Sequence, residues 1–199
     1  MTDRNLIILP YGTELERPVL EATAHRVLRR FRGYYTGTQI LDARSPPEGA
    51  AFTYLVEKSS FFIGNKNGRF FRGLQEEFEE SHTLVVTNMP LRYMCSLGGM
   101  GAPKFNYLNG TASTATKKAI VSTWNYADNP ALLAQLEEIS THELGHVFGI
   151  DHHRTEISHG NYCLMVRGSE SERLQAEGIK TEEFCNDCCS TIDKIKEAT

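Results

Sequence analysis

The chain has 199 residues, of which 40% are hydrophobic and 23% charged, so it is long enough to bury a core of its own in one domain. Its net charge of -4 offers no basic excess to bind nucleic acid or an anionic membrane surface, and we expect neither as a partner. The early apolar run 6–9 is too short for a signal-peptide core or a membrane span, and we therefore expect a cytoplasmic protein.

The first part of the chain alternates between helix and strand signals. Apolar residues at helical spacing predict one helix that begins near Pro18 and ends before Gly33, and a second helix over 69–80. Short runs rich in β-branched and aromatic residues predict strands over 6–9, 35–41, 83–87, 105–108 and 119–124.

The second part begins with a long helix and ends in a less regular tail. Apolar spacing predicts a helix from Pro130 through Val147, with Gly149 just past its end. The last helix is predicted to begin near Thr181 or Glu182 and to run through Ile192 and Ile195. Because strands and helices alternate before an irregular tail, we predict an α/β (α+β) fold in a single domain, 1–199.

The long helix ends in the sequence His-Glu-Leu-Gly-His-Val-Phe-Gly-Ile-Asp-His, which spans 142–152. Residues four apart share a helix face, so His142 and His146 can both point an imidazole nitrogen at one zinc ion. Gly149 can adopt the left-handed conformation that ends the helix and turns the chain so that His152 reaches the same ion. Three imidazoles leave one coordination position open for water, which is typical of a catalytic zinc.

Glu143 follows the first of these histidines, so it does not share their face, and it is predicted to be the general base. Zinc lowers the pKa of its bound water toward about 7, and Glu143 can take a proton from that water. The water would then attack a peptide carbonyl, and Glu143 would return the proton to the leaving amine. We therefore predict a zinc-dependent metallopeptidase, a hydrolase that acts on peptides or proteins.

The motif is also the signature of the metzincin clan when a methionine follows it. More narrowly, the sequence resembles the archaemetzincins, in which cysteines straddle that methionine and a late Cys-x-x-Cys follows. The matching elements here are Cys163-Leu164-Met165 and Cys185-Asn186-Asp187-Cys188.

The resemblance implies a zincin fold with a mixed, mostly parallel five-stranded sheet and a helix that carries the active site. It implies an upper lobe of about 1–150 and an irregular lower lobe of about 151–199 that ends in a helix. Met165 would form the hydrophobic floor beneath the zinc, although on spacing alone a methionine is more often core filler.

A second, structural zinc is predicted in the lower lobe, which would make two zinc ions per chain. Cys185 and Cys188 have the spacing that lets two thiolates bind one metal from a single turn, and Cys163 is predicted to be the third ligand. For the fourth ligand we choose His153, because it occupies the position of a family cysteine and imidazole is an acceptable replacement.

Two other assignments of the cysteines remain open. The segment 154–162 is longer than in the family, so His159 or Cys189 are alternatives to His153 as the fourth ligand. The competing interpretation without a metal is a set of free buried thiols, or a disulfide from Cys163.

The metzincin resemblance implies that a substrate lies antiparallel to an edge strand beside the cleft, and we expect that edge over 105–108. The chain is expected to be a monomer. A zinc-stabilised peptide-binding or protein-binding module without turnover is the alternative function, and the presence of Glu143 disfavours it. A nucleic-acid-binding zinc element is disfavoured by the acidic tail.

Overall fold

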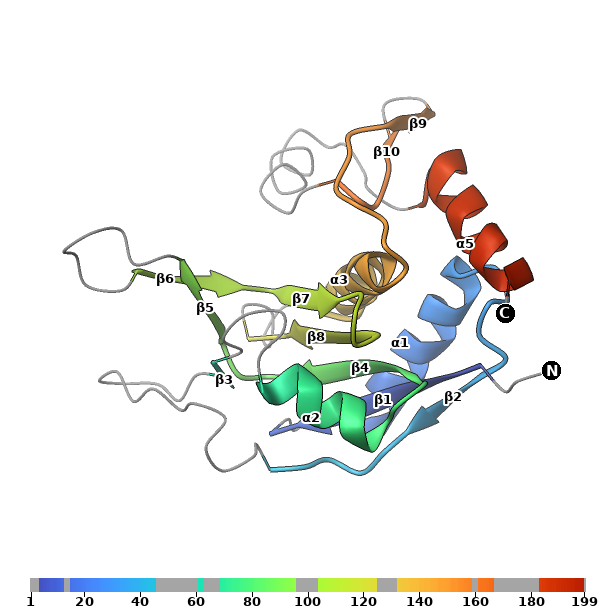
Figure 1. The fold of residues 1–199 in the computed structure, drawn as a ribbon. Helices are drawn as coiled ribbons and strands as arrows, with labels where there is room; N and C mark the ends of the chain where they lie inside the picture. The colour runs from blue at the N-terminus through green and yellow to red at the C-terminus, as the bar shows by residue number, and fades with distance from the viewer. Residues whose placement is uncertain are drawn as a thin grey trace.

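The computed structural model describes residues 4–12, 15–45, 61–62, 69–95, 104–124, 132–158, 161–166 and 183–198. A five-stranded sheet forms the centre of this structure (Figure 1). In spatial order its strands are β2 (Gly37–Ile40), β1 (Asn5–Tyr11), β4 (His82–Thr87), β8 (Lys118–Ser122) and β7 (Gly110–Ser113). The first four strands run parallel and β7 is antiparallel to β8, which confirms the predicted mixed, mostly parallel sheet and the α/β fold.

Helices cover both faces of the sheet, and this explains why its central strands are nearly continuous runs of apolar residues. The helices α1 (Arg17–Arg30) and α3 (Leu132–Val147) pack on one face, where Leu84 contributes to the larger core. The helix α2 (Arg69–Glu77) packs on the other face, where the next residue, Val85, belongs to a second, smaller core. Because successive side chains along a strand point to opposite faces of the sheet, one strand contributes residues to both cores.

A second, three-stranded sheet contains β3 (Phe61–Phe62), β5 (Leu91–Cys95) and β6 (Lys104–Leu108), in the order β3-β5-β6. The expected substrate edge, 105–108, lies in β6 and therefore not in the five-stranded sheet. The strand β6 is an edge of this second sheet, and the edge strand of the five-stranded sheet beside α3 is β7, so which of the two edges pairs with a substrate stays a prediction. The sequence Gly-Thr-Ala-Ser of β7 has no bulky alternating residues, and only its pairing with β8 makes it a strand.

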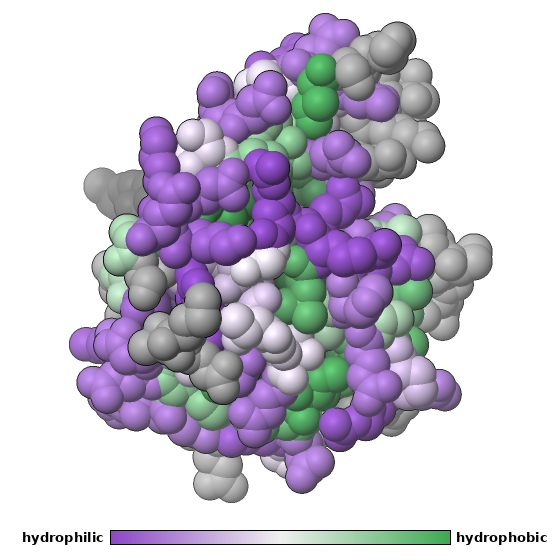
Figure 2. Space-filling view, turned by 90° about the vertical axis from the view of Figure 1, so that its right-hand side faces the viewer, coloured by the Kyte–Doolittle hydropathy of each residue, from purple (hydrophilic) through white to green (hydrophobic). Residues whose placement is uncertain are grey.

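The last part of the chain passes over α3 and returns to the core (Figure 1). Two short antiparallel strands, β9 (Glu156–Ser158) and β10 (Asn161–Tyr162), precede α5 (Asn186–Ala198), whose Ile192 is buried in the larger core. The final helix begins later than predicted because Glu183 is held in extended pairing with Cys163. The face on which α1 and α5 lie is mostly hydrophilic, with scattered hydrophobic residues (Figure 2). Within the described ranges, no helix is long and apolar enough to cross a membrane.

Candidate metal centres

Three histidines meet beside the C-terminal half of α3. The Nε2 atom of His152 lies 3.1 Å from Nε2 of His142 and 3.1 Å from Nε2 of His146. In the described part of the chain, this group of possible metal-binding side chains contains these three residues and no others. A tetrahedral zinc with nitrogens at about 2.0–2.1 Å separates its ligands by about 3.3 Å, so this first cluster fits a zinc ion.

Backbone carbonyls orient two of the rings. Nδ1 of His142 lies 2.8 Å from the carbonyl oxygen of Leu164, and Nδ1 of His146 lies 2.7 Å from that of Ile150. A carbonyl only accepts, so each Nδ1 must carry the hydrogen, and each Nε2 keeps its lone pair for a metal. Burial lowers the pKa of His142 to about 4, with smaller effects from its neighbours, so its ring is neutral at pH 7.

The turn after α3 brings His152 back toward the helix. Gly149 has a φ of +75°, a left-handed backbone conformation that residues other than glycine rarely adopt. Its N–H donates to the carbonyl of His146 (2.9 Å), and the N–H of Ile150 donates to that of Gly145 (3.1 Å). These two bonds form a Schellman motif, which ends the helix and reverses the chain.

Glu143 is 8% exposed and lies against the first residue of β7. A Cβ atom added to Gly110 would lie 2.6 Å from Cγ of Glu143 and 2.8 Å from its Oε1. The strand and the carboxylate therefore approach each other as closely as a glycine allows. The carboxylate lies one residue along α3 from His142, outside the group of three histidines.

Met165 is fully buried and packs against α3 at Gly145, the residue before His146. A Cβ atom at Gly145 would lie 2.5 Å from the sulfur of Met165 and 3.4 Å from the ring of Phe184. The helix can rest on Met165 only because residue 145 has no side chain. This packing places the methionine directly against the helix that carries the first cluster.

A second cluster contains His153, Cys163, Cys185 and Cys188. Nε2 of His153 lies 3.1 Å from the sulfur of Cys163, 3.3 Å from that of Cys185 and 3.4 Å from that of Cys188. The sulfur of Cys188 lies 3.6 Å from Cys163 and 3.5 Å from Cys185. In a tetrahedral zinc site with Zn–S bonds near 2.3 Å, sulfurs are separated by about 3.8 Å, so these four atoms also fit one ion.

The positions of the sulfurs bear on two of the alternatives for the cysteines, the disulfide and Cys189 as a ligand. The three sulfurs are too far apart for disulfides, whose S–S bond is about 2.0 Å, and the cysteines are free. Cys189 is outside the cluster, and its sulfur lies 3.8 Å from the carbonyl oxygen of Phe184. His159 lies outside the described residues.

Hydrogen bonds to its sulfur favour the thiolate form of Cys163. The thiol of Cys188 has the largest effect, and backbone N–H groups, including that of Cys185 at 3.4 Å, add to it against the effect of burial. Together these hydrogen bonds lower the pKa of Cys163 to about 5. The same contact between the two sulfurs raises the pKa of Cys188. A thiolate is the form in which cysteine binds metals.

One stretch of chain, 152–165, connects the two clusters. His152 of the first cluster is followed directly by His153 of the second, and Cys163 is followed by Leu164, whose carbonyl orients His142. The N–H of His153 also donates to the carbonyl of Met165 (3.2 Å). The second cluster therefore holds the backbone that completes the first.

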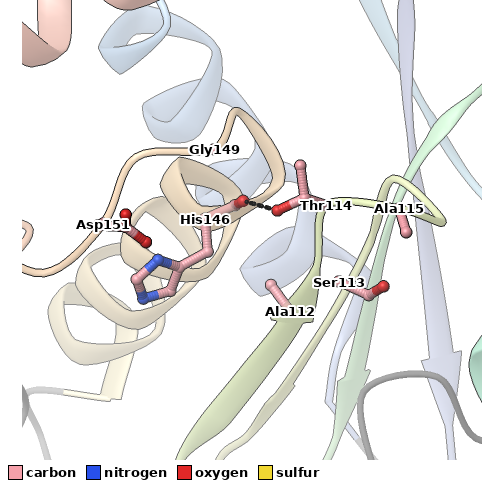
Figure 3. Close-up of a pocket in the computed structure, with 7 residues that line it drawn as sticks. All are labelled: Ala112, Ser113, Thr114, Ala115, His146, Gly149 and Asp151. Carbon is pink, nitrogen blue, oxygen red and sulfur yellow. Dashed lines mark hydrogen bonds between the residues drawn. The ribbon is translucent and has the colours of Figure 1, made fainter.

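A cavity of about 250 Å³ opens between His146 and the end of β7 (Figure 3). Oγ1 of Thr114 donates to the carbonyl of His146 across it (2.7 Å), and the carboxylate of Asp151 lies near the histidine ring. The lining residues are Ala112, Ser113, Thr114, Ala115, His146, Gly149 and Asp151. A molecule bound in this cavity would lie beside the first cluster.

Sequence analysis missed the groups that position these side chains. The carbonyls of Leu164 and Ile150 carry no residue-type signal, because every residue has a carbonyl. Gly110 and Gly145 have no motif of their own, and their role appears only when two distant segments come together. The Asn109-Gly110 pair is a turn-like signal, but it does not indicate contact with a helix.

Comparison with solved structures identifies the fold. An archaemetzincin from Methanopyrus kandleri aligns with 98% of this chain and 96% of its own, at 19% identity and a TM-score of 0.63. The chain has the archaemetzincin fold. An archaemetzincin from Archaeoglobus fulgidus in complex with malonate aligns with 94% of this chain and 99% of its own, at 19% identity and a TM-score of 0.58.

A third similar structure is a zinc-dependent peptidase from Methanocorpusculum labreanum, which covers 94% of this chain and 99% of its own at 18% identity and a TM-score of 0.60. No protein-family model matches the sequence, and no curated protein matches it. Since identity is low throughout, the archaemetzincin fold is evident from the structure and not from overall sequence similarity.

Proposed function

We propose that the chain is a zinc-dependent metallopeptidase whose catalytic zinc is held by His142, His146 and His152. The observation that carries this proposal is the convergence of three Nε2 atoms beside a helix on which the buried Glu143 directly follows His142. The fold supports this proposal, because it is shared with archaemetzincins and with a protein described as a zinc-dependent peptidase. Three imidazoles leave a coordination position open, as catalytic sites do.

Glu143 is the general base in this proposal. When bound, zinc supplies a Lewis acid that polarises a peptide carbonyl and makes a water molecule more acidic. Glu143 takes a proton from the attacking water on its carboxylate and passes that proton to the nitrogen of the leaving amine. Its burial beside β7 keeps the carboxylate in one place, so it does not have to be ordered in each catalytic cycle.

The second cluster is the proposed site of a structural zinc, with His153, Cys163, Cys185 and Cys188 as ligands. Four protein ligands close the coordination sphere, which is the arrangement of structural zinc sites. A metal there would join the segment after α3 to the start of α5. In this proposal Met165 is the floor of the first site, and 151–199 form a lower lobe.

The test of the peptidase function is digestion of a complex peptide library by the zinc-loaded chain, with new termini identified by mass spectrometry. Glu143→Gln keeps the shape of the side chain but removes the base, and cleavage should fall by about 10²–10⁴-fold. Glu76→Gln, the same change at an exposed position of α2, is the matched control and should cleave like the wild type.

Cleavage that persists unchanged in Glu143→Gln would contradict the assignment of the base. A wild-type chain that binds library peptides but releases no products would contradict the peptidase function and favour a binding module instead.

A further inference from the structure

The first residue of the edge strand β7 lies in direct contact with Glu143. A Cβ atom at Gly110 would meet three atoms of the Glu143 side chain, at 2.6 Å from Cγ, 2.8 Å from Oε1 and 3.0 Å from Cδ. All three nearest atoms belong to this one side chain. Two carbon atoms in contact are normally separated by about 3.5–4.0 Å, so a methyl group has no room here.

Backbone conformation does not require the glycine. Gly110 lacks the positive φ found at Gly33 and Gly149, so an L-residue can adopt its backbone angles. An alanine at 110 would therefore act through the volume of its methyl group and not through backbone strain. The glycine is needed for close approach alone.

The strand has little freedom to move away from the added methyl group. Gly110 is paired with Val121 of the buried strand β8, and the N–H of Ser122 donates to the carbonyl of Asn109 (2.7 Å). At the other end of β7, Thr114 is tied to α3 by its hydrogen bond to the carbonyl of His146. With the strand fixed at both ends, the side chain of Glu143 is the part that must shift.

We propose that Gly110 is a positioning residue, which fixes the Glu143 carboxylate by allowing the edge strand to pack against it. This inference rests on the proposed role of Glu143 as the base, and it assigns to β7 a part in placing that base. A general base must be held within hydrogen-bond reach of the proton that it moves, and a displacement of about 1 Å can reduce the rate about 10²-fold.

The test compares Gly110→Ala with the wild type for zinc content, kcat and KM on a peptide that the wild type cleaves. We expect unchanged zinc content, a similar KM and a kcat lower by about 10–100-fold, because the three atoms nearest the added methyl group belong to Glu143 and not to a metal-binding ring. Gly73→Ala is the matched control, since a Cβ there meets nothing within 4 Å, and its kcat should equal that of the wild type.

Combination with Glu143→Ala separates positioning from a general structural effect. Once Glu143 is truncated, Gly110→Ala should cause no further loss of kcat, because the base that it displaces is already gone. Thermal unfolding gives a readout without turnover: Gly110→Ala should lower the midpoint by roughly 2–10 °C in the wild type, and much less when residue 143 is alanine.

Three results would overturn the inference. An undiminished kcat in Gly110→Ala is one, and an equal loss of kcat in the Glu143→Ala background is another. The third is an equal thermal shift in both backgrounds. If Gly110→Ala does not fold, folding of the double variant would support the contact, and failure of both would overturn it.

Failure of the proposed function gives a different pattern. A wild-type chain without peptidase activity would contradict the assignment of Glu143 as a base. The thermal cycle would still decide whether Gly110 controls the position of that carboxylate.

Discussion

His146 has both of its ring nitrogens in defined positions. Nδ1 donates to the carbonyl of Ile150 at 2.7 Å, and Nε2 faces His152 at 3.1 Å. The backbone carbonyl of His146 in turn accepts from Thr114 of the neighbouring strand segment. One residue therefore connects the proposed metal, the turn at the end of α3 and the end of β7.

Replacement of His146 by alanine should remove the zinc of the first cluster, because two imidazoles bind zinc weakly. Elemental analysis of protein prepared without chelator should show two zinc ions per chain in the wild type and one in the variant. His25→Ala, at an exposed position of α1, should keep both. An unchanged zinc content in His146→Ala would rule out the proposed ligand set.

Gly145→Ala should destabilise the chain although alanine favours helices more than glycine does. The added Cβ would lie 2.5 Å from the sulfur of Met165, and overpacking of this kind costs about 1–3 kcal/mol. Gly73→Ala, in an open position of α2, should instead be neutral or stabilising by up to about 1 kcal/mol. Urea denaturation measures both changes, and equal effects of the two substitutions would contradict the packing of Met165 against α3.

At the scale of elements, the segment 152–165 joins the two clusters and carries the methionine between them. Its hydrogen bonds reach α3 through Leu164, which accepts from His142, and it pairs with Glu183 just before α5. A change at the cysteine cluster must therefore reach the histidine cluster through the backbone. With a zinc bound as proposed, the second site would support the first.

Cys185→Ser should release the second zinc and weaken binding of the first by about 10–100-fold, the usual effect of disturbing groups that orient metal ligands. Competition with a chromophoric chelator measures this affinity. Cys189→Ser is the matched control, because Cys189 is adjacent to the cluster in sequence but not part of it. A first site of unchanged affinity in Cys185→Ser would show that the two clusters are independent.

At the scale of the whole molecule, the sheet and α3 meet at an aromatic cluster around His82, the first residue of β4. Its ring lies 5.1 Å from that of Phe148 and 5.5 Å from that of Tyr34, and its Nδ1 lies 2.9 Å from the hydroxyl of Tyr35. Burial, with smaller effects of Lys117 and Lys118, lowers the pKa of His82 to about 4. The folded chain therefore keeps this ring neutral.

This lowered pKa predicts a loss of stability in acid. Above the unfolded-state pKa of about 6.5, neither the folded nor the unfolded chain binds this proton, so His82 causes no loss of stability there. Between pH 6.5 and about 4, only the unfolded chain takes up the proton. The free energy of unfolding should fall across this window by about 3 kcal/mol from this residue. In His82→Phe that part of the decrease should disappear, as measured by urea denaturation from pH 7 to pH 4. Identical pH profiles for the two proteins would show that His82 is not the responsible group.

Much of the first cluster follows from sequence because its determinants are local. The helical repeat of 3.6 residues places His142 and His146 on one face, and only glycine suits the left-handed turn at 149. The spacing of Cys185 and Cys188 is also local, since Cys185 directly precedes α5 and Cys188 lies in its first turn. The central strands β1, β4 and β8 could be predicted as well, because burial on both faces requires continuous apolar runs.

The tertiary structure alone decided which segments meet. It brought His153 rather than Cys189 to the cysteine cluster, and it made β7 rather than 105–108 the edge strand beside α3. The physical reason is that these contacts join residues far apart in the chain, where no periodicity relates one to the other. Gly110 and Glu143 are the clearest case: neither residue type predicts the contact, and it exists because the sheet and the helix pack together.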